Sequence, residues 1–375
     1  MTLNSSNKVA QTSPYWALGE AEEVEAFCLA STLVIEGVKF GVLHSVRELK
    51  VLEIIHKRGP NNHLSAAEIA AELPTNNPEA AAVALGRMLD LLASYSVLTV
   101  TPITLPGGIV QRRYGLAPVC KFLIPDEHGG YLAPTSNVCM YKPMIESSLL
   151  LKDAVLEGVE PFKKAHGMGF YEYFAKQPKR QEDFNDGMSS SSILLLRELL
   201  KKYTGFKGIA TLVDVGGGNG TTLRAILAEY PSIKGINFDQ PQVIANAPSC
   251  PGVEQVGGSI FEKIPKGDAM FMKWICHCFN DETCITILKN CYDALPEDHG
   301  KVIICEALLP DQSETTFNLA AKAAYQFDAL MMATTGGRER TQKEFEVLAF
   351  AAGFQSFDVV CSVHNSKIME LIKKN

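Results

Sequence analysis

Three ionisable residues in the C-terminal half of the chain have side chains that suit proton transfer. His277 follows the apolar run 269–274, and Glu306 follows the apolar run 302–305. Glu339 lies in a glycine-containing loop before another helix. An imidazole titrates near neutral pH, and neighbouring carboxylates can fix its tautomer and favour its protonated form. A lone histidine is more often structural, but strand ends and loops converge at one sheet edge, so we expect these residues to share a pocket.

A glycine-rich loop after a buried strand is a candidate cofactor site. The strand 212–215 runs into three consecutive glycines that begin at Gly216, and a fourth glycine precedes a helix. Glycines allow a sharp turn and let a ligand lie against the backbone. A dinucleotide loop needs a glycine where Thr221 stands here, so the spacing disfavours a nicotinamide cofactor. The alternative is a loop that turns for packing reasons alone.

Two acidic residues flank this loop. Asp214 lies in the strand before it, and Asp239 ends the next strand, where an acidic side chain can hold ribose hydroxyls. S-adenosylmethionine has no phosphates, so its site needs acidic or neutral polar groups and no helix-dipole anion cradle. We therefore expect S-adenosylmethionine as the cofactor.

The elements that must position these residues alternate between strand and helix from about residue 205. Such alternation predicts an α/β fold with a mostly parallel sheet, which binds ligands beyond the carboxyl ends of its strands. The last two strands are close together in the sequence and should pair antiparallel. The predicted strands are 211–215, 233–239, 253–257, 269–274, 301–306, 356–361 and 367–372, and the predicted helices are 221–230 and 282–295.

The N-terminal part, from Glu20 to about Leu123, reads as mostly helical. Residues 24–30 are apolar nearly all round, which predicts a helix buried against more than one surface, and a partner chain could supply one of them. Ser65 begins a capping-box pattern for a helix that ends near Leu73.

A helix from Asn77-Pro78 and strands at 97–101 and 110–114 follow, around a Pro-Gly-Gly turn. Helix, helix and hairpin are the outline of a winged helix. Many winged helices bind DNA, but the last helix offers only Arg87 among apolar residues. Dimerisation or use as a substrate lid is the preferred interpretation.

Composition supports a small-molecule enzyme. The formal net charge of −7 argues against a broad phosphate-binding surface, because nucleic-acid affinity rests largely on Lys and Arg. No apolar run reaches the roughly 18 residues of a membrane span, and residues 1–15 lack the order of a secretory signal, so we expect a cytoplasmic protein. The 10 cysteines have no regular spacing. A metal site among Cys276, Cys278, Cys284 and Cys291 is disfavoured because paired Cys-x-x-Cys spacing is missing.

These motifs together resemble the plant caffeic acid O-methyltransferase family of small-molecule methyltransferases, over about Glu20 to Lys373. The most specific segments are 212–218, 235–239, 251–254, 272–277 and 336–345. The resemblance implies a homodimer with an N-terminal winged-helix domain, residues 1–155, that contributes to the interface and the substrate cavity. Residues 156–375 are then the S-adenosylmethionine-binding catalytic domain, with a Rossmann-like sheet.

The resemblance also implies roles for individual residues. His277 is expected to be the general base, flanked and oriented by Glu306 and Glu339. The implied cofactor contacts are Asp214, Gly216, Gly218, Asp239, Ser259, Ile260 and Lys273. The implied substrate contacts are Val138, Cys139, Phe170, Phe174, Arg180, Phe184, Met188, Ser191, Cys278, Ala329, Leu330 and Thr334; for Met188, core packing is an equal alternative.

Several of these positions depart from the family pattern. Ser259 and Ile260 stand where Asp and Met are usual, so a hydrogen bond to the adenine amino group is lost and cofactor affinity is expected to be lower. Cys278-Phe279 replaces Asp-Trp, which removes a carboxylate near the reacting group and makes a catechol a poor substrate. Ser148, Arg180, Ser191 and Thr334 replace Trp, Phe, His and Asn.

Three functions are compatible with this pattern. The preferred one is methyl transfer from S-adenosylmethionine to a hydroxyl of a small phenolic plant metabolite, because all three acid–base residues are retained. The second is N-methylation of a small aromatic amine such as an anthranilate-like acceptor, suggested by the Cys in place of Asp. The third is a non-catalytic binding protein on a methyltransferase scaffold. No metal is expected in any of them, because the acid–base residues replace a Lewis acid.

Overall fold

The computed structural model describes residues 18–373, except residues 298, 312 and 314–317. Contacts within the chain divide it into two compact units, Met1–Cys120 and Lys121–Asn375. This division precedes residue 155, after which we predict the catalytic domain to begin. The difference arises because helix α6 (Ala133–Cys139) packs along helix α11 (Pro178–Lys202) and so joins the second unit. The functional boundary stays a prediction.

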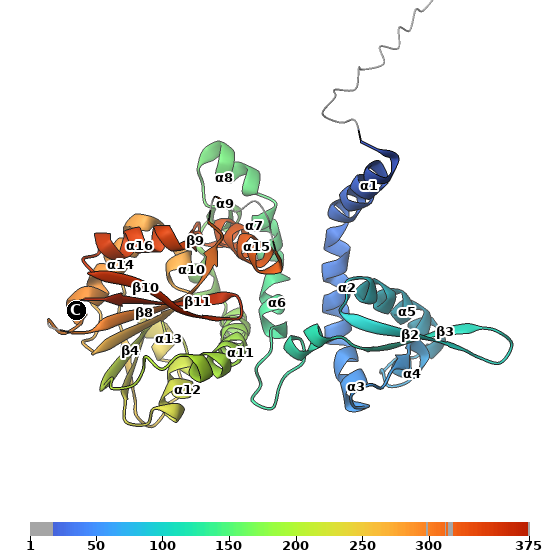
Figure 1. Cartoon of the computed structure of the whole chain (residues 1–375), viewed down its shortest axis with the longest axis horizontal. Helices are drawn as coiled ribbons and strands as arrows, with labels where there is room; N and C mark the ends of the chain where they lie inside the picture. The colour runs from blue at the N-terminus through green and yellow to red at the C-terminus, as the bar shows by residue number, and fades with distance from the viewer. Residues whose placement is uncertain (1–17, 298, 312, 314–317, 374–375) are drawn as a thin grey trace, which may run out of the picture. The chain divides into compact units, whose positions relative to one another are not determined.

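The first unit has the predicted order of helices followed by a hairpin (Figure 1). Ser65 Oγ accepts from the Glu68 amide and Asn77 Oδ1 from the Ala80 amide, which confirms both predicted helix starts. The helix after Ser65 ends at Ala70, earlier than the predicted Leu73. The helices are α1 (Glu20–Val34), α2 (Glu36–Glu48), α3 (Val51–Lys57), α4 (Ala66–Ala70) and α5 (Pro78–Ser94), and the strands are β1 (Leu64–Ser65), β2 (Leu98–Thr104) and β3 (Val110–Leu116), antiparallel in the order β1-β3-β2.

Helix α1 departs from its prediction, because every one of its residues is exposed in the single chain. Phe27 is 72% exposed and Leu33 is 61% exposed. The apolar composition therefore marks a surface that this chain leaves uncovered, and the predicted burial within the chain is wrong. Among the described residues, no single helix is long and apolar enough to cross a membrane; only α1 and α2 taken together, bent by 56°, pass that test of length and composition.

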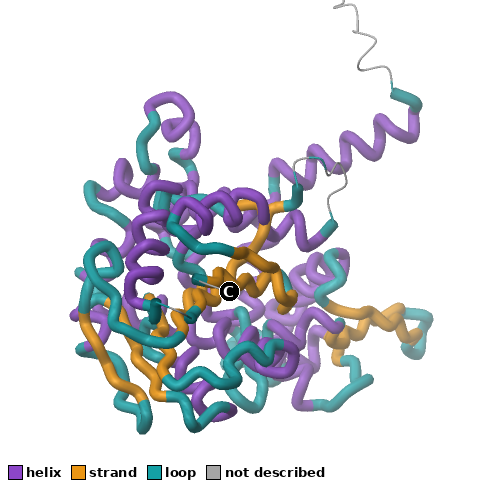
Figure 2. The backbone as a smooth tube through the Cα atoms, turned by 60° about the vertical axis from the view of Figure 1, so that its left-hand side comes forward, coloured by secondary structure: helices purple, strands orange, loops and turns teal. Residues whose placement is uncertain are grey.

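The second unit contains an eight-stranded sheet with helices on both faces (Figures 1 and 2). Its order is β10-β11-β8-β7-β4-β5-β6, with the two-residue β9 beside β8. The chain order reverses between β4 and β7, which is the place where ligands bind in such sheets. The strands are β4 (Thr211–Val215), β5 (Lys234–Asp239), β6 (Val253–Gly257), β7 (Ala269–Lys273), β8 (Lys301–Leu309), β9 (Arg340–Thr341), β10 (Ser356–Val363) and β11 (Ser366–Ile372).

Two apolar layers hold this sheet. One face packs against α14 (Asp281–Ala294) and α16 (Gln342–Ala351), through side chains such as Ile287 and Leu348. The other face packs against α11 and α12 (Thr221–Glu229), through side chains such as Leu199 and Ile226. Strands buried on both faces read as continuous apolar runs, which is why the sequence predicted them well.

One strand, β8, ends later than the sequence predicts. β10 and β11 pair antiparallel as predicted, and β11 also pairs antiparallel with β8 as far as Ala307. This pairing lengthens β8 beyond its predicted end, so Glu306 lies within the strand and not at its end. The remaining helices of this unit are α7 (Lys142–Ser148), α8 (Leu151–Glu157), α9 (Pro161–His166), α10 (Phe170–Ala175), α13 (Pro241–Ile244) and α15 (Leu319–Thr334).

Candidate active site

Neighbouring strands bring the three acid–base residues together. β7 and β8 are parallel neighbours with Lys273 opposite Cys305, and β9 pairs with β8 through Arg340 and Leu308. His277 lies in a short 3-10 turn, η3 (Cys276–Cys278), just after β7, and Glu339 immediately precedes β9. The predicted convergence of the three residues is therefore present in the structure.

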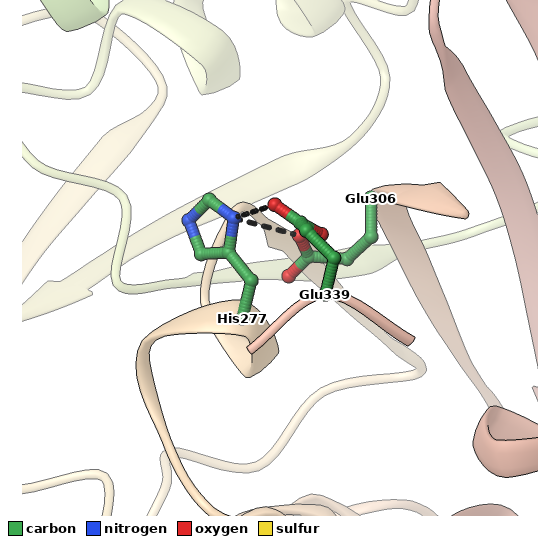
Figure 3. Close-up of side chains that lie close together, drawn as sticks. All are labelled: His277, Glu306 and Glu339. Carbon is green, nitrogen blue, oxygen red and sulfur yellow. Dashed lines mark hydrogen bonds and ion pairs between the residues drawn. The ribbon is translucent and has the colours of Figure 1, made fainter. Parts of the chain in front are cut away.

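The two carboxylates meet one nitrogen of the imidazole ring (Figure 3). His277 Nδ1 lies 2.8 Å from Glu339 Oε1 and 3.6 Å from Glu306 Oε2. Glu306 Oε1 accepts hydrogen bonds of 2.8 Å from the amides of Ile275 and Cys276. The other ring nitrogen, Nε2, faces away from both carboxylates (Figure 3). The ring is thus held at Nδ1 and presents Nε2 on its opposite side.

Burial and charge both act on these groups. The side chains of Glu306 and Glu339 are 0% and 2% exposed, and that of His277 is 13% exposed. Burial alone would lower the pKa of His277, but the charge of Glu306, the neighbouring Cys278 and the hydrogen bond that the ring donates to Glu339 outweigh it and hold that pKa well above its ordinary value. Burial raises the pKa of Glu306 to about 7, although its interaction with His277 opposes the increase. The site therefore favours a proton on the imidazole.

The backbone turns sharply to place His277. Trp274 has φ of 57°, a left-handed conformation that costs energy in a non-glycine residue. Gly337 allows the Glu339 loop to approach, because a Cβ at this position would lie 2.1 Å from the His277 carbonyl oxygen. Any side chain at residue 337 would push Glu339 away from His277.

The three loop glycines have different functions in the structure. A Cβ on Gly216 would lie 2.4 Å from Ile275 Cδ1, and one on Gly217 would lie 2.1 Å from Asn237 Oδ1. A Cβ on Gly218 would meet no atom within 4 Å. Gly216 and Gly217 thus allow close packing, whereas Gly218 borders open space that a ligand can use.

Acidic groups border the loop as predicted. Asp239 Oδ2 accepts a 2.8 Å hydrogen bond from the Gly218 amide, and its Oδ1 accepts from the Gln240 amide. Asp214 is buried, its Oδ2 has no hydrogen-bond partner among the described atoms, and burial raises its pKa to about 7. The Lys273 ammonium lies 3.7 Å from the centre of the Trp274 ring, and burial lowers its pKa. An unpartnered carboxylate and a second one beside open space suit a cationic ligand without phosphates.

The predicted adenine-side residues lie in a tight turn after β6. Ser259 Oγ accepts from the Phe261 amide, and the Ile260 carbonyl accepts a 2.9 Å hydrogen bond from Asn290 Nδ2. The ring of Phe261 packs edge-on against that of Phe279, with centroids 5.4 Å apart. Through this contact the turn is linked to the segment that carries His277 and Cys278.

Five predicted substrate-contact residues share one apolar cluster on the helical part of the second unit. Several of its rings pack at centroid separations of 4.7 to 5.7 Å, which forms an aromatic wall. The five are Val138, Phe170, Phe174, Phe184 and Leu330.

The other predicted substrate contacts have individual environments. Ser191 is buried and lies 2.7 Å from Thr135 Oγ1. Thr334 is buried, and its hydroxyl donates its hydrogen to the Leu330 carbonyl of its own helix. Arg180 is exposed, and its guanidinium lies 3.9 Å from the centre of the Tyr141 ring. Cys139, Met188 and Ala329 are partly buried.

Comparison with known proteins decides the family. A family model described as an O-methyltransferase domain matches residues 149–355, and one described as an O-methyltransferase dimerisation domain matches residues 34–126. O-methyltransferase 1 of Lophophora williamsii is 53% identical over 96% of this chain and 99% of its own length. Caffeic acid 3-O-methyltransferase of Catharanthus roseus is 52% identical over 99% of both chains. The chain belongs to the O-methyltransferase family.

This membership confirms the predicted resemblance to plant caffeic acid O-methyltransferases and the predicted cofactor. The protein is an S-adenosylmethionine-dependent O-methyltransferase with a dimerisation domain. The solved structure of human N-acetylserotonin methyltransferase has a TM-score of 0.76 and covers 96% of this chain and 100% of its own, at 20% identity. At that identity the likeness concerns the fold, which is the predicted one.

One residue of this O-methyltransferase site was absent from the prediction. Tyr171 Oη lies 2.9 Å from Cys278 Sγ, and the loss of solvation at this hydroxyl, together with Cys278, raises its pKa well above the ordinary value, although the residue as a whole is 39% exposed. The Tyr171 hydroxyl therefore lies beside the residue that follows His277. Its place between Phe170 and Phe174 was the available sequence signal, but only the structure shows that it faces Cys278.

The acid–base residues could also be considered as metal ligands. His277, Glu306 and Glu339 each offer one donor atom within 4.8 Å of the others. However, Glu306 Oε1 already accepts from two amides and His277 Nδ1 is at hydrogen-bond distance from Glu339. The sequence disfavours a cysteine metal site. In the structure, Cys284 Sγ donates a hydrogen bond to the Cys276 carbonyl. A proton-transfer role accounts for the geometry without an ion.

We predict that Asp214→Asn stabilises the cofactor-free protein while weakening its binding of S-adenosylmethionine. Because burial raises the Asp214 pKa from 3.8 to about 7, the folded state retains a proton that the unfolded state loses, so stability falls as pH rises through this range. At pH 8 the variant should gain on the order of 2 to 4 kcal/mol in unfolding free energy.

Urea unfolding at pH 5 and pH 8 measures this difference, which should be smaller at pH 5. Calorimetry with S-adenosylmethionine measures the accompanying loss of affinity, because the variant lacks a carboxylate to attract the cationic cofactor. An Asp214→Asn protein that is less stable than the native protein at pH 8 would contradict the burial argument.

Proposed function

We propose that this O-methyltransferase transfers a methyl group to a hydroxyl of a small phenolic plant metabolite, with His277 as the general base. The observation that carries the proposal is the 2.8 Å contact of His277 Nδ1 with Glu339, which leaves Nε2 facing away from the carboxylates (Figure 3). The names of the relatives, among them caffeic acid 3-O-methyltransferases, support a phenolic acceptor.

Proton removal is the part of the reaction that this group performs. A phenol has a pKa of about 10, so at neutral pH it is a weak nucleophile until a base within hydrogen-bond reach takes its proton. In the neutral form of the ring, which becomes more populated as pH rises, Nδ1–H donates to Glu339, so Nε2 is the unprotonated nitrogen that accepts the phenol proton. The charge of Glu306, with Oε2 at 3.6 Å, stabilises the imidazolium that results.

The cofactor site supplies the methyl group that the acceptor oxygen receives. S-adenosylmethionine, when bound, provides a sulfonium methyl that an oxygen nucleophile can attack in line. Asp239 would hold the ribose hydroxyls, and the Gly216 and Gly218 backbone would border the cofactor. Asp214 and Lys273 would complete the surroundings, with Asp214 compensating the positive charge. Alignment of oxygen, methyl and sulfur then supplies much of the remaining rate.

The acceptor site is aromatic and largely uncharged. Phe170, Phe174 and Phe184 form its wall, and the Cys278 thiol is engaged by Tyr171 Oη. With Cys278 in place of the Asp usual in the family, no carboxylate follows the base directly to bind a second acceptor hydroxyl. We therefore propose that a catechol is a poorer acceptor than a phenol that carries hydrogen or an ether group next to its reacting hydroxyl.

We predict that His277→Ala lowers kcat for a phenol of ordinary acidity by about 100-fold or more, because the proton acceptor is lost. A nitrophenol that is already ionised at the assay pH should lose far less activity. Both are measured by turnover with labelled S-adenosylmethionine, and calorimetric binding of the cofactor is the control. Full activity of the variant on phenols would refute His277 as the base. Activity on aromatic amines alone would refute the phenolic acceptor.

We predict that a chelator in excess leaves methyl transfer unchanged. One oxygen of Glu306 accepts from backbone amides and one oxygen of Glu339 contacts His277, so these carboxylates serve the base and the acid–base group replaces a Lewis acid. Turnover is compared with and without the chelator after dialysis. Activity that disappears and returns on addition of Mg²⁺ would contradict this assignment.

A homodimer is the proposed assembly. The dimerisation-domain model begins at residue 34, where helix α1 ends, and α1 exposes Val24, Phe27 and Leu33. A second copy of the chain is the occupant that this family membership supports. Apolar side chains exposed to this extent over three turns of helix are typical of an interface.

We predict that the double variant Phe27→Asp, Leu33→Asp is monomeric, because it places charges where a dimer would bury apolar side chains. Light scattering after size-exclusion chromatography gives the mass. Val347→Asp is the control, since Val347 is an exposed apolar residue of helix α16 with 57% exposure. A double variant that remains dimeric would show that α1 is not part of the interface.

A further inference from the structure

Arg340 is a fully buried cation next to the acid–base residues. It follows Glu339 directly, begins strand β9 and is 0% exposed. A buried guanidinium is costly unless its N–H groups find partners. Its partners should therefore indicate why the chain tolerates it.

The guanidinium spans the turn that carries His277. Nη1 donates to the Cys276 carbonyl at 2.9 Å, and Nη2 donates to the Phe279 carbonyl at 2.8 Å. These two carbonyls immediately flank His277 and Cys278. Nε and Nη2 lie 2.8 Å from Asp281 Oδ1, which balances the charge and orients the planar group. The planar guanidinium thus holds both ends of the turn that carries His277.

The same short segment contacts this turn at two more points. Gly337 lies against the His277 carbonyl, where a Cβ would be only 2.1 Å away. Glu339 contacts His277 Nδ1 at 2.8 Å, and its own amide donates to Asp328 Oδ1 at 2.8 Å. Residues 337–340 therefore form a strap that holds the His277 backbone through Arg340 and the His277 ring through Glu339.

A purely structural function is the alternative. Arg340 lies 6.0 Å from the centre of the Phe345 ring and could serve only to fill the core. However, helix α14 has its own N-cap, because Asn280 Oδ1 accepts from the Thr283 amide. The start of α14 therefore does not need Arg340. The Cys276 carbonyl also accepts from the Phe279 amide and from Cys284 Sγ, but the guanidinium is the charged planar donor that joins it to the Phe279 carbonyl.

We propose that Arg340 is a positioning residue that sets the orientation of His277 by clamping the Cys276 and Phe279 carbonyls. This inference rests on the proposed base function of His277 but concerns geometry that exists without cofactor or acceptor. Lysine in its place keeps the charge but offers a single point donor, which cannot span both carbonyls.

The test compares the native protein with Arg340→Lys and with the control Arg338→Met. Arg338 belongs to the same segment, is 44% exposed and pairs with Glu344 of helix α16. For each protein, NMR with labelled histidine follows the titration of His277 in the cofactor-free chain, with the signal assigned by His277→Gln. Initial rates give kcat and KM, and thermal unfolding gives stability.

In Arg340→Lys the His277 ring should lose alignment with Glu339. Its titration midpoint should move toward the ordinary value by about one unit or more. The value of kcat should fall about 10- to 100-fold, as for a misplaced catalytic group, while KM for S-adenosylmethionine stays within about twofold. Arg338→Met should match the native protein in both measurements.

A change in thermal stability alone, with an unaltered His277 midpoint and kcat, would overturn the proposal. If Arg340→Lys fails to fold, Asp281→Asn provides the same test, because Asp281 is 45% exposed and its loss releases the guanidinium from its anchor. A native protein that methylates no phenol would refute the proposed function. The titration of His277 would still show whether Arg340 orients the His277 ring.

Discussion

The hydrogen bond between His277 Nδ1 and Glu339 is the interaction on which the site depends. It fixes the tautomer of the ring and thereby decides that Nε2 is the nitrogen that can accept a proton. The two residues come from segments separated by helix α14, strand β8 and helix α15. The sheet order β8-β7 and the short β9 pairing bring them together, and the left-handed Trp274 completes the turn. The acid–base chemistry is thus a consequence of strand order.

Burial of these charges carries a cost that the rest of the unit must offset. Glu306 and Glu339 each keep one oxygen without a hydrogen-bond partner among the described atoms, and burial raises the Glu306 pKa from 4.5 to about 7. Since the folded state then binds a proton that the unfolded state has released, Glu306 makes stability fall as pH rises through that range. The continuous apolar layers on both faces of the sheet provide the compensating burial.

Much of this arrangement was predictable from the sequence because it rests on local patterns. The buried strands and the capping residues Ser65 and Asn77 follow from apolar runs and spacing. Glu306 was placed at a strand end because its pairing with β11 is not a local property. Burial of α1 was predicted from composition, which cannot distinguish a core from an uncovered surface. Arg340 lies in a recognised motif, yet only tertiary structure shows that its guanidinium reaches the turn around His277.

The two sides of the imidazole differ in electrostatic character. Behind Nδ1 lie two buried carboxylates, whereas the residue that follows the base, Cys278, is hydrogen-bonded to the neutral Tyr171 hydroxyl. A carboxylate at position 278 would compete with Glu306 and Glu339 for the proton and would repel a developing phenolate. The Cys278–Tyr171 pair removes that repulsion but also removes a partner for a second acceptor hydroxyl. Acceptor choice in this chain should therefore depend on aromatic shape more than on hydrogen bonding beside the reacting oxygen.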